Sequence, residues 1–262
     1  VETKYDDTDL GVTESLFALG NGYLGMRSNP EEGRDAHSHG TFLNGFHETW
    51  EIKHAEEAYG FATTGQTIVN VPDGKLMKLY VDDEPLLLGT ADLAEYERSI
   101  DFREGVLRRD LLWRTPSGNR VKVSSTRLVS LVHRHLAMVT IEITPLDAPV
   151  PIVVSSQLLN RQDGEDEYHV RSAALGEGKD PRKASKFNER VLEPQLQQRE
   201  EGSVVLGFRC RNSGMTLACG YWNHVDAACE TRIETTLEND LAKSVITALP
   251  DAGETVTITK FL

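Results

Sequence analysis

Short segments in which apolar and polar residues alternate constrain this 262-residue chain more than any other feature. Val139, Ile141 and Ile143 alternate with polar residues, and the segments 77–81, 121–124 and 255–259 show the same period. A period of two places the apolar side chains on one face of an extended chain, so each segment predicts a half-buried β-strand. Shorter β-rich segments lie at 151–156, 204–210 and 215–222.

Turn-forming residues separate the predicted strands. Pro116, Ser117 and Gly118 lie between two strand patterns, as in a hairpin loop, and residues 82–85, 200–203 and 251–254 have a similar composition. Helical patterns are confined to 56–59 and 238–244, and the polar segment 176–188 predicts a long exposed loop. Many short strands separated by turns predict an all-β sandwich or barrel. Because no linker interrupts the pattern, we expect one domain over residues 1–262.

Charge and cysteine content narrow the expected partners and location. The chain has 41 acidic and 28 basic residues, a formal net charge of −13. Binding to nucleic acid or to an anionic membrane needs a basic surface, so we expect neither partner. The three cysteines, Cys210, Cys219 and Cys229, include no CxxC pair, which argues against a disulfide framework or structural zinc and favours a cytoplasmic protein.

A glycine-rich segment, residues 20–25, formally satisfies the GxGxxG pattern of dinucleotide sites. That pattern has its meaning only between a strand and a helix, and here Pro30 follows without a helical period. We therefore predict a tight turn in which glycine adopts positive φ. Asn21, Tyr23 and Arg27 are then polar groups beside a bend, where they could contact a ligand or another protein surface.

Histidines and tryptophans supply the remaining candidates. Residues 37–54 contain four histidines and two glutamates, but without a recognised ligand spacing, so we expect no metal site. Trp50 lies in a loop-like stretch and is a candidate for stacking on a sugar ring, whereas Trp113 and Trp222 lie within strand patterns and are predicted to be in the core. No residue pattern indicates a catalytic group, and we assign none.

Several segments together resemble the N-terminal domain of glycoside hydrolase family 65, which includes maltose, trehalose and kojibiose phosphorylases and some trehalose hydrolases. Residues 14–27, with the sequence ESLFALGNGYLGMR, are similar to the segment that opens this domain. Later segments that match in the same order are 39–48, 100–109, 127–130, 143–147 and 257–261. Ser28 and Asn44 depart from the family pattern, which usually has glycine and a small residue at these positions.

The resemblance implies an antiparallel β-supersandwich of the galactose mutarotase-like kind. In the family this non-catalytic domain precedes a helical linker and an (α/α)6 barrel that carries the catalytic glutamate and the phosphate site, and we expect that barrel to be absent here. The implied partners are that barrel in the same polypeptide, an α-linked glucose disaccharide and a second copy of the protein. No cofactor is implied beyond inorganic phosphate as the parent enzyme's co-substrate. The residues expected to face the barrel or the substrate are Asn21, Gly22, Tyr23, Arg27 and Trp50.

Two alternative functions remain open at this stage. The first is a stand-alone carbohydrate-binding module, with Trp50, Tyr23 and residues 37–51 as its binding surface. The second is a mutarotase-like sugar epimerase that uses a histidine and a glutamate, which rests only on fold analogy.

Overall fold

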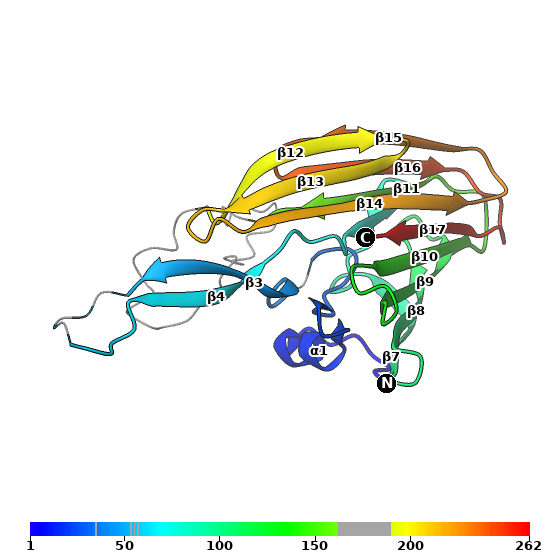
Figure 1. Cartoon of the computed structure of the whole chain (residues 1–262). Coiled ribbons are helices and arrows are strands. Elements are labelled where there is room, and N and C mark those ends of the chain that lie inside the picture. The colour runs from blue at the N-terminus through cyan, green and yellow to red at the C-terminus, as the bar shows by residue number, and fades with distance from the viewer. Residues whose placement is uncertain (35, 53, 55, 57, 162–189) are drawn as a thin grey trace.

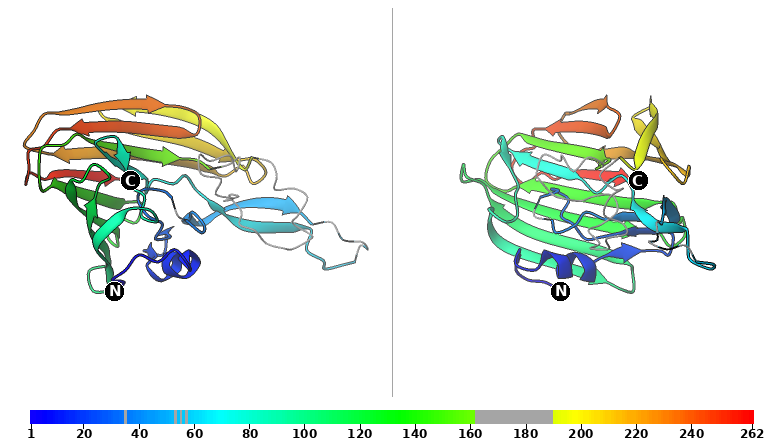
Figure 2. Two further views of the ribbon diagram at one scale, coloured as in Figure 1. Left: turned by 180° about the vertical axis from the view of Figure 1, so that it is seen from behind. Right: turned by 90° about the vertical axis from the view of Figure 1, so that its left-hand side faces the viewer.

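The computed structural model describes residues 1–34, 36–52, 54, 56, 58–161 and 190–262, and almost all of its regular structure is antiparallel β-strand (Figure 1). Two sheets pack face to face, and a third, smaller sheet with one helix lies against them (Figure 2). The predicted all-β sandwich is therefore confirmed. The predicted loop at 176–188 lies outside the described residues.

The largest sheet has eight strands, and its middle strands correspond to the clearest alternating segments of the sequence. Its order is β12-β13-β14-β17-β10-β9-β8-β7, and every neighbouring pair is antiparallel. The strands are β7 (Asp92–Asp101), β8 (Val106–Arg114), β9 (Arg120–Val129), β10 (Ala137–Pro145), β12 (Leu192–Glu200), β13 (Ser203–Cys210), β14 (Thr216–Asp226) and β17 (Val256–Phe261).

A five-stranded sheet, in the order β15-β16-β11-β5-β6, covers part of the inner face of the first. Val139, Ile141 and Trp113 from the large sheet meet Leu79 and Val154 from the second, and each of the five is at most 2% exposed. Trp113 thus lies in the core as predicted. The strands are β5 (Met77–Val81), β6 (Glu84–Pro85), β11 (Ile152–Leu159), β15 (Thr231–Leu237) and β16 (Leu241–Ala248).

The third sheet contains β1 (Leu19–Gly20), β2 (Leu24–Met26), β3 (Thr41–Glu51) and β4 (Thr64–Asn70), and it follows helix α1 (Leu10–Leu16). Strands β3 and β4 form a hairpin that projects from the sandwich (Figures 1 and 2). Gly45, at φ +82, lies within an irregularity of this pairing, where a left-handed residue allows a bulge. In the part of the chain that the structure describes, no helix has the length and apolar character to cross a membrane.

The turn predictions are confirmed, whereas the helix predictions are not. Glu201 and Gly202 have φ of 44° and 84° between β12 and β13, as a tight hairpin turn requires. The predicted helix at 238–244 is wrong, because most of this segment belongs to β16. In that strand every second residue, Ala242, Ser244 and Ile246, is buried. At 56–59 the described residues form only a bend and a turn.

Candidate functional site

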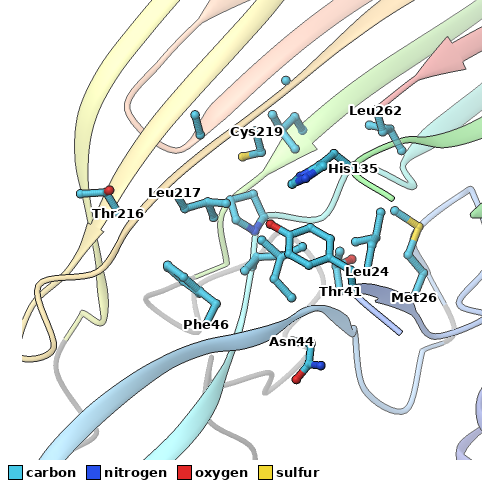
Figure 3. A pocket seen from close by; sticks show the side chains of 18 of the residues that line it. Leu24, Met26, Thr41, Asn44, Phe46, His135, Thr216, Leu217, Cys219 and Leu262 are labelled. Carbon is cyan, nitrogen blue, oxygen red and sulfur yellow. The ribbon is translucent and has the colours of Figure 1, made fainter. Parts of the chain in front are cut away.

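A largely apolar pocket of about 520 Å³ opens beside β2, β3 and β14, and the last residue of the chain lines it (Figure 3). Leu24 and Phe46 come from the small sheet, Leu217 and Cys219 from β14, and Leu262 follows β17. Such a cavity, with few polar groups among apolar walls, is the usual form of a ligand or docking site.

Tyr23 is the one residue among the five site candidates that lines this pocket. Its ring centroid lies 4.5 Å from that of His135, and the guanidinium carbon of Arg134 lies 5.1 Å from the Tyr23 centroid. The loop between β9 and β10 therefore fixes the tyrosine at the pocket edge through a tilted ring–ring contact, at an interplanar angle of 57°, and a cation–π contact. Asn44, one of the departures from the family pattern, also lines the pocket.

Asn21 fixes the glycine-rich turn to the large sheet. Its Nδ2 donates to the carbonyls of Ser130 and Arg134 at 2.6 and 3.0 Å, and its Oδ1 accepts from the backbone nitrogens of Tyr23 and Leu24 at 2.9 and 2.8 Å. Its amide is thus used within the domain. Gly22 has φ of +85°, so the predicted tight turn is confirmed.

Replacing Asn21 with alanine is expected to destabilise the chain by about 1–2 kcal/mol, because four hydrogen bonds are lost and two carbonyls lose their donor. Urea denaturation followed by tryptophan fluorescence measures this. Asn44→Ala is the matched control, since Asn44 is exposed and its side-chain amide donates one hydrogen bond, to the Gly22 carbonyl at 3.1 Å. Equal losses of stability in the two variants would contradict the role assigned to Asn21.

Arg27 also acts inside the domain. Its Nη2 lies 3.1 Å from Oε2 of Glu14, its Nη1 donates to the Ser15 hydroxyl at 3.1 Å and its Nε donates to the Ser38 carbonyl at 3.1 Å. Glu14 is 1% exposed and also accepts from the backbone nitrogen of His37 at 2.7 Å. The two polar ends of the segment 14–27 therefore join α1 to residues 37–38, and the guanidinium makes its hydrogen bonds within the domain.

Trp50 lies in strand β3 and not in a loop, so that prediction is wrong. It is half-buried, and its ring covers Gly65 of β4 so closely that a Cβ there would lie 2.3 Å from ring carbons. Trp50 does not line the pocket that Tyr23 lines.

Two polar residues of the segment 37–54, Glu48 and His39, contact other parts of the domain. Glu48 accepts from the backbone nitrogens of Asn212 and Ser213 at 3.0 and 2.6 Å, which ties β3 to the loop between β13 and β14. His39 Nδ1 lies 3.2 Å from Oδ2 of Asp73. Over the described ranges, no three His, Cys, Asp or Glu side chains converge as metal ligands would.

Two buried carboxylates are held in the ionised form by basic neighbours. Burial opposes the ionisation of Glu31, but Arg127 and Arg109 outweigh it and lower its pKa to about 2. Burial likewise opposes the charge of Asp73, but Lys75 lies 2.8 Å away and, with other groups, holds the pKa of Asp73 well below its ordinary value. A general acid needs a raised pKa, so neither carboxylate suits that role.

These features define an antiparallel β-sandwich domain with an apolar pocket beside its C-terminal strand. The chain belongs to glycosyl hydrolase family 65, because the family model described as "Glycosyl hydrolase family 65, N-terminal domain" matches residues 1–262.

Relatives support the same assignment. An uncharacterized glycosyl hydrolase of Mycobacterium tuberculosis is 36% identical over 261 residues, and an α,α-trehalose phosphorylase of Thermoanaerobacter brockii is 32% identical over 269 residues. Each match covers 100% of this chain but only 32% and 33% of the relative, so the chain spans about a third of their length. A solved structure from the human microbiome, provisionally named a kojibiose phosphorylase, has the same fold, with a TM-score of 0.80 at 19% identity over 99% of this chain and 31% of that one.

Proposed function

We propose that this chain is the non-catalytic N-terminal domain of a longer family 65 enzyme that acts on α-linked glucose disaccharides. One observation carries the proposal: the chain aligns over its whole length with proteins about three times as long. The names of the relatives, trehalose and kojibiose phosphorylases, supply the substrate class and inorganic phosphate as co-substrate. The reaction then belongs to the catalytic part, for which this domain forms a supporting surface.

The chemistry of the described residues agrees with a non-catalytic role for this domain. Cleavage of a glycosidic bond needs a carboxyl group that can donate a proton, and inversion by phosphate needs no second protein carboxylate as base. Glu31 and Asp73 are ionised by their neighbours, and Glu14 and Glu48 accept hydrogen bonds from backbone nitrogens elsewhere in the fold. The residues that line the pocket beside Tyr23 then form a surface that faces the catalytic part of the enzyme.

The same proposal includes a cytoplasmic, homodimeric enzyme. The three cysteines of this chain are unpaired, as in a reducing compartment, and Cys210 is buried. We assign no surface of this domain to the dimer interface.

The 262-residue chain alone is expected to release neither glucose 1-phosphate nor glucose from trehalose, kojibiose or maltose, with or without phosphate. The gene product read past the codon for Leu262 is expected to release one of them. The assay is coupled detection of both sugars, with heat-inactivated protein as the background. Release of either sugar by the 262-residue chain above that background would overturn its proposed non-catalytic role. A stop codon directly after the codon for Leu262 would overturn the proposal that the chain is part of a longer enzyme.

A further inference from the structure

Trp222 lies on the outer face of the eight-stranded sheet and is 43% exposed, so its predicted place in the core is wrong. The preceding residue, Tyr221, is 3% exposed and its hydroxyl lies 2.9 Å from the Ser244 hydroxyl in the interior. Because successive side chains of a strand point to opposite faces, the inward position of Tyr221 sends the indole outward. An exposed indole is informative where it belongs to a larger exposed apolar patch.

Trp222 begins a row of apolar side chains that crosses four adjacent strands. The registered pairs Trp222–Phe261, Phe261–Met138 and Met138–Leu128 run from β14 through β17 and β10 to β9. The Trp222 and Phe261 rings stack with centroids 5.4 Å apart and an interplanar angle of 22°. Phe261, Met138 and Leu128 are half-buried. We call these four residues the outer row.

The neighbouring row on the same face is polar. Two residues further along each strand, the registered residues are His224, Thr259, Thr140 and Thr126. The hydroxyls of Thr140 and Thr259 lie 3.1 Å apart. The apolar surface on the sheet is therefore one residue wide. At the same end of the sheet, the loop after β9 exposes Leu131 by 77% and Val132 by 86%, so the apolar surface continues into that loop.

We propose that the outer row is the docking surface for the chain segment that follows Leu262. This inference rests on the proposed function, in which the catalytic part continues the same polypeptide. Phe261 is a member of the outer row, and Leu262 pairs with Ala137 through both backbone hydrogen bonds, at 2.9 and 3.1 Å. Since β17 lies between β14 and β10, any residue that follows Leu262 starts at the middle of the row.

The dimensions of the outer row fit an amphipathic helix laid across the strands. Neighbouring strands lie about 4.8 Å apart, and an α-helix advances about 5.4 Å per turn. One apolar side chain per helical turn can therefore contact one strand after another, while the polar helix face points away from the sheet. A second subunit fits less well, because a stable interface buries roughly 800 Å² on each partner, which is wider than a single row of side chains.

Hydroxyl-radical footprinting of the 262-residue chain and of the longer gene product tests this contact directly, because tryptophan and methionine side chains are both oxidised readily. In the longer product, oxidation of Trp222 and Met138 is expected to fall about five-fold or more, as for side chains removed from water at an interface. In the 262-residue chain both should be oxidised at every protein concentration.

Trp222→Glu supplies a second, independent measurement. In the longer product it is expected to lower the unfolding midpoint of this domain by about 5 °C, because a carboxylate would be buried against apolar groups. In the 262-residue chain the midpoint should fall clearly less, since only the stacking of Trp222 on Phe261 is lost there. His224→Glu, on the same strand and face but in the polar row, is the matched control and should be neutral in both proteins.

The outcomes separate this inference from the proposed function. Unchanged oxidation of Trp222 in a longer and catalytically active product would overturn the outer row as a docking surface and leave the proposed function intact. Protection of Trp222 that grows with the concentration of the 262-residue chain would overturn it in favour of a second copy. A stop codon after Leu262 would overturn both.

Discussion

Replacing Arg127 with alanine is expected to destabilise the chain by about 3–5 kcal/mol, the usual cost of leaving one partner of a buried ion pair without the other. Arg127 is 2% exposed, although it carries a full charge. Its Nη2 donates to Glu31 Oε1 at 2.5 Å and to the Asn29 carbonyl at 2.9 Å, and its Nη1 donates to the Arg27 carbonyl at 3.2 Å. Alanine would remove all three contacts at once.

Arg127 belongs to a buried ionic layer between the N-terminal segment and the large sheet. Arg109 of β8 contacts Glu32 through both terminal nitrogens, at 2.8 and 2.6 Å, and lies 3.2 Å from Glu31. Burial opposes the charge of Arg109, but Glu32 and Glu31 outweigh it and raise its pKa. The layer fixes residues 27–32 on the inner face of β8 and β9, and it thereby positions the turn that carries Tyr23.

Urea denaturation of Arg127→Ala, followed by tryptophan fluorescence, measures the loss. Arg120→Ala is the control, because Arg120 pairs with Asp147 at 2.6 Å on the surface, where solvent screens the charges and little stability is at stake. The double variant Arg127→Met/Glu31→Met is expected to be more stable than Arg127→Ala, since no buried charge is then left alone. Similar losses in Arg127→Ala and Arg120→Ala would contradict the buried layer.

The sequence predicts the strands well because their signal is local. The alternation at 77–81 and in Val139–Ile143 reports burial of one strand face, which needs no knowledge of the partner strand. It does not report which face is inner where both are apolar. In the segment 215–222, Tyr221 and Trp222 are both large aromatic residues, and the packing of Tyr221 in the core, with Leu217 and Cys219 on the same strand face, places Trp222 outward.

The site residues were harder to predict because their partners lie far away in the sequence. Asn21 and Arg27 are polar groups beside a bend, which is equally typical of a contact surface and of an internal clamp. Asn21 finds its acceptors more than 100 positions further on, at Ser130 and Arg134, and no local pattern contains that information. Tyr23 differs because its side chain reaches the pocket edge.

The chain is expected to become more stable as the pH rises from 7 to about 8, by up to about 1.4 kcal/mol per pH unit. The source is Lys260, which is fully buried and whose Nζ donates to the carbonyls of Gln157 at 2.5 Å and Leu76 at 3.2 Å. Burial lowers the pKa of Lys260 to about 7, although Asp73 favours its charge.

The sign follows from comparing the folded and unfolded chains. The unfolded lysine keeps its proton up to about pH 10.4, so between pH 7 and that value the unfolded chain binds more protons, and stability rises with pH. Cysteine acts in the opposite direction at higher pH. Burial raises the pKa of Cys210 to about 11 and that of Cys219 to about 12, whereas unfolded cysteine loses its proton near about 8.5, so stability falls above that point. The rise is therefore confined to pH 7–8.

Urea denaturation at closely spaced pH values from 6.5 to 8.5 measures this rise, and two variants assign it to Lys260. Lys260→Met removes the titrating group, so its stability should not rise over this range, and it should exceed the native chain most at low pH, where the native lysine is charged. Lys260→Arg keeps the charge at every pH and should be both less stable and flat. If the stability of Lys260→Met rose with pH as steeply as that of the native chain, another group would be responsible for the rise. The buried lysine would then have to stay protonated, stabilised by its two hydrogen bonds to carbonyls and by the Tyr221 ring, whose centroid lies 4.5 Å from Nζ.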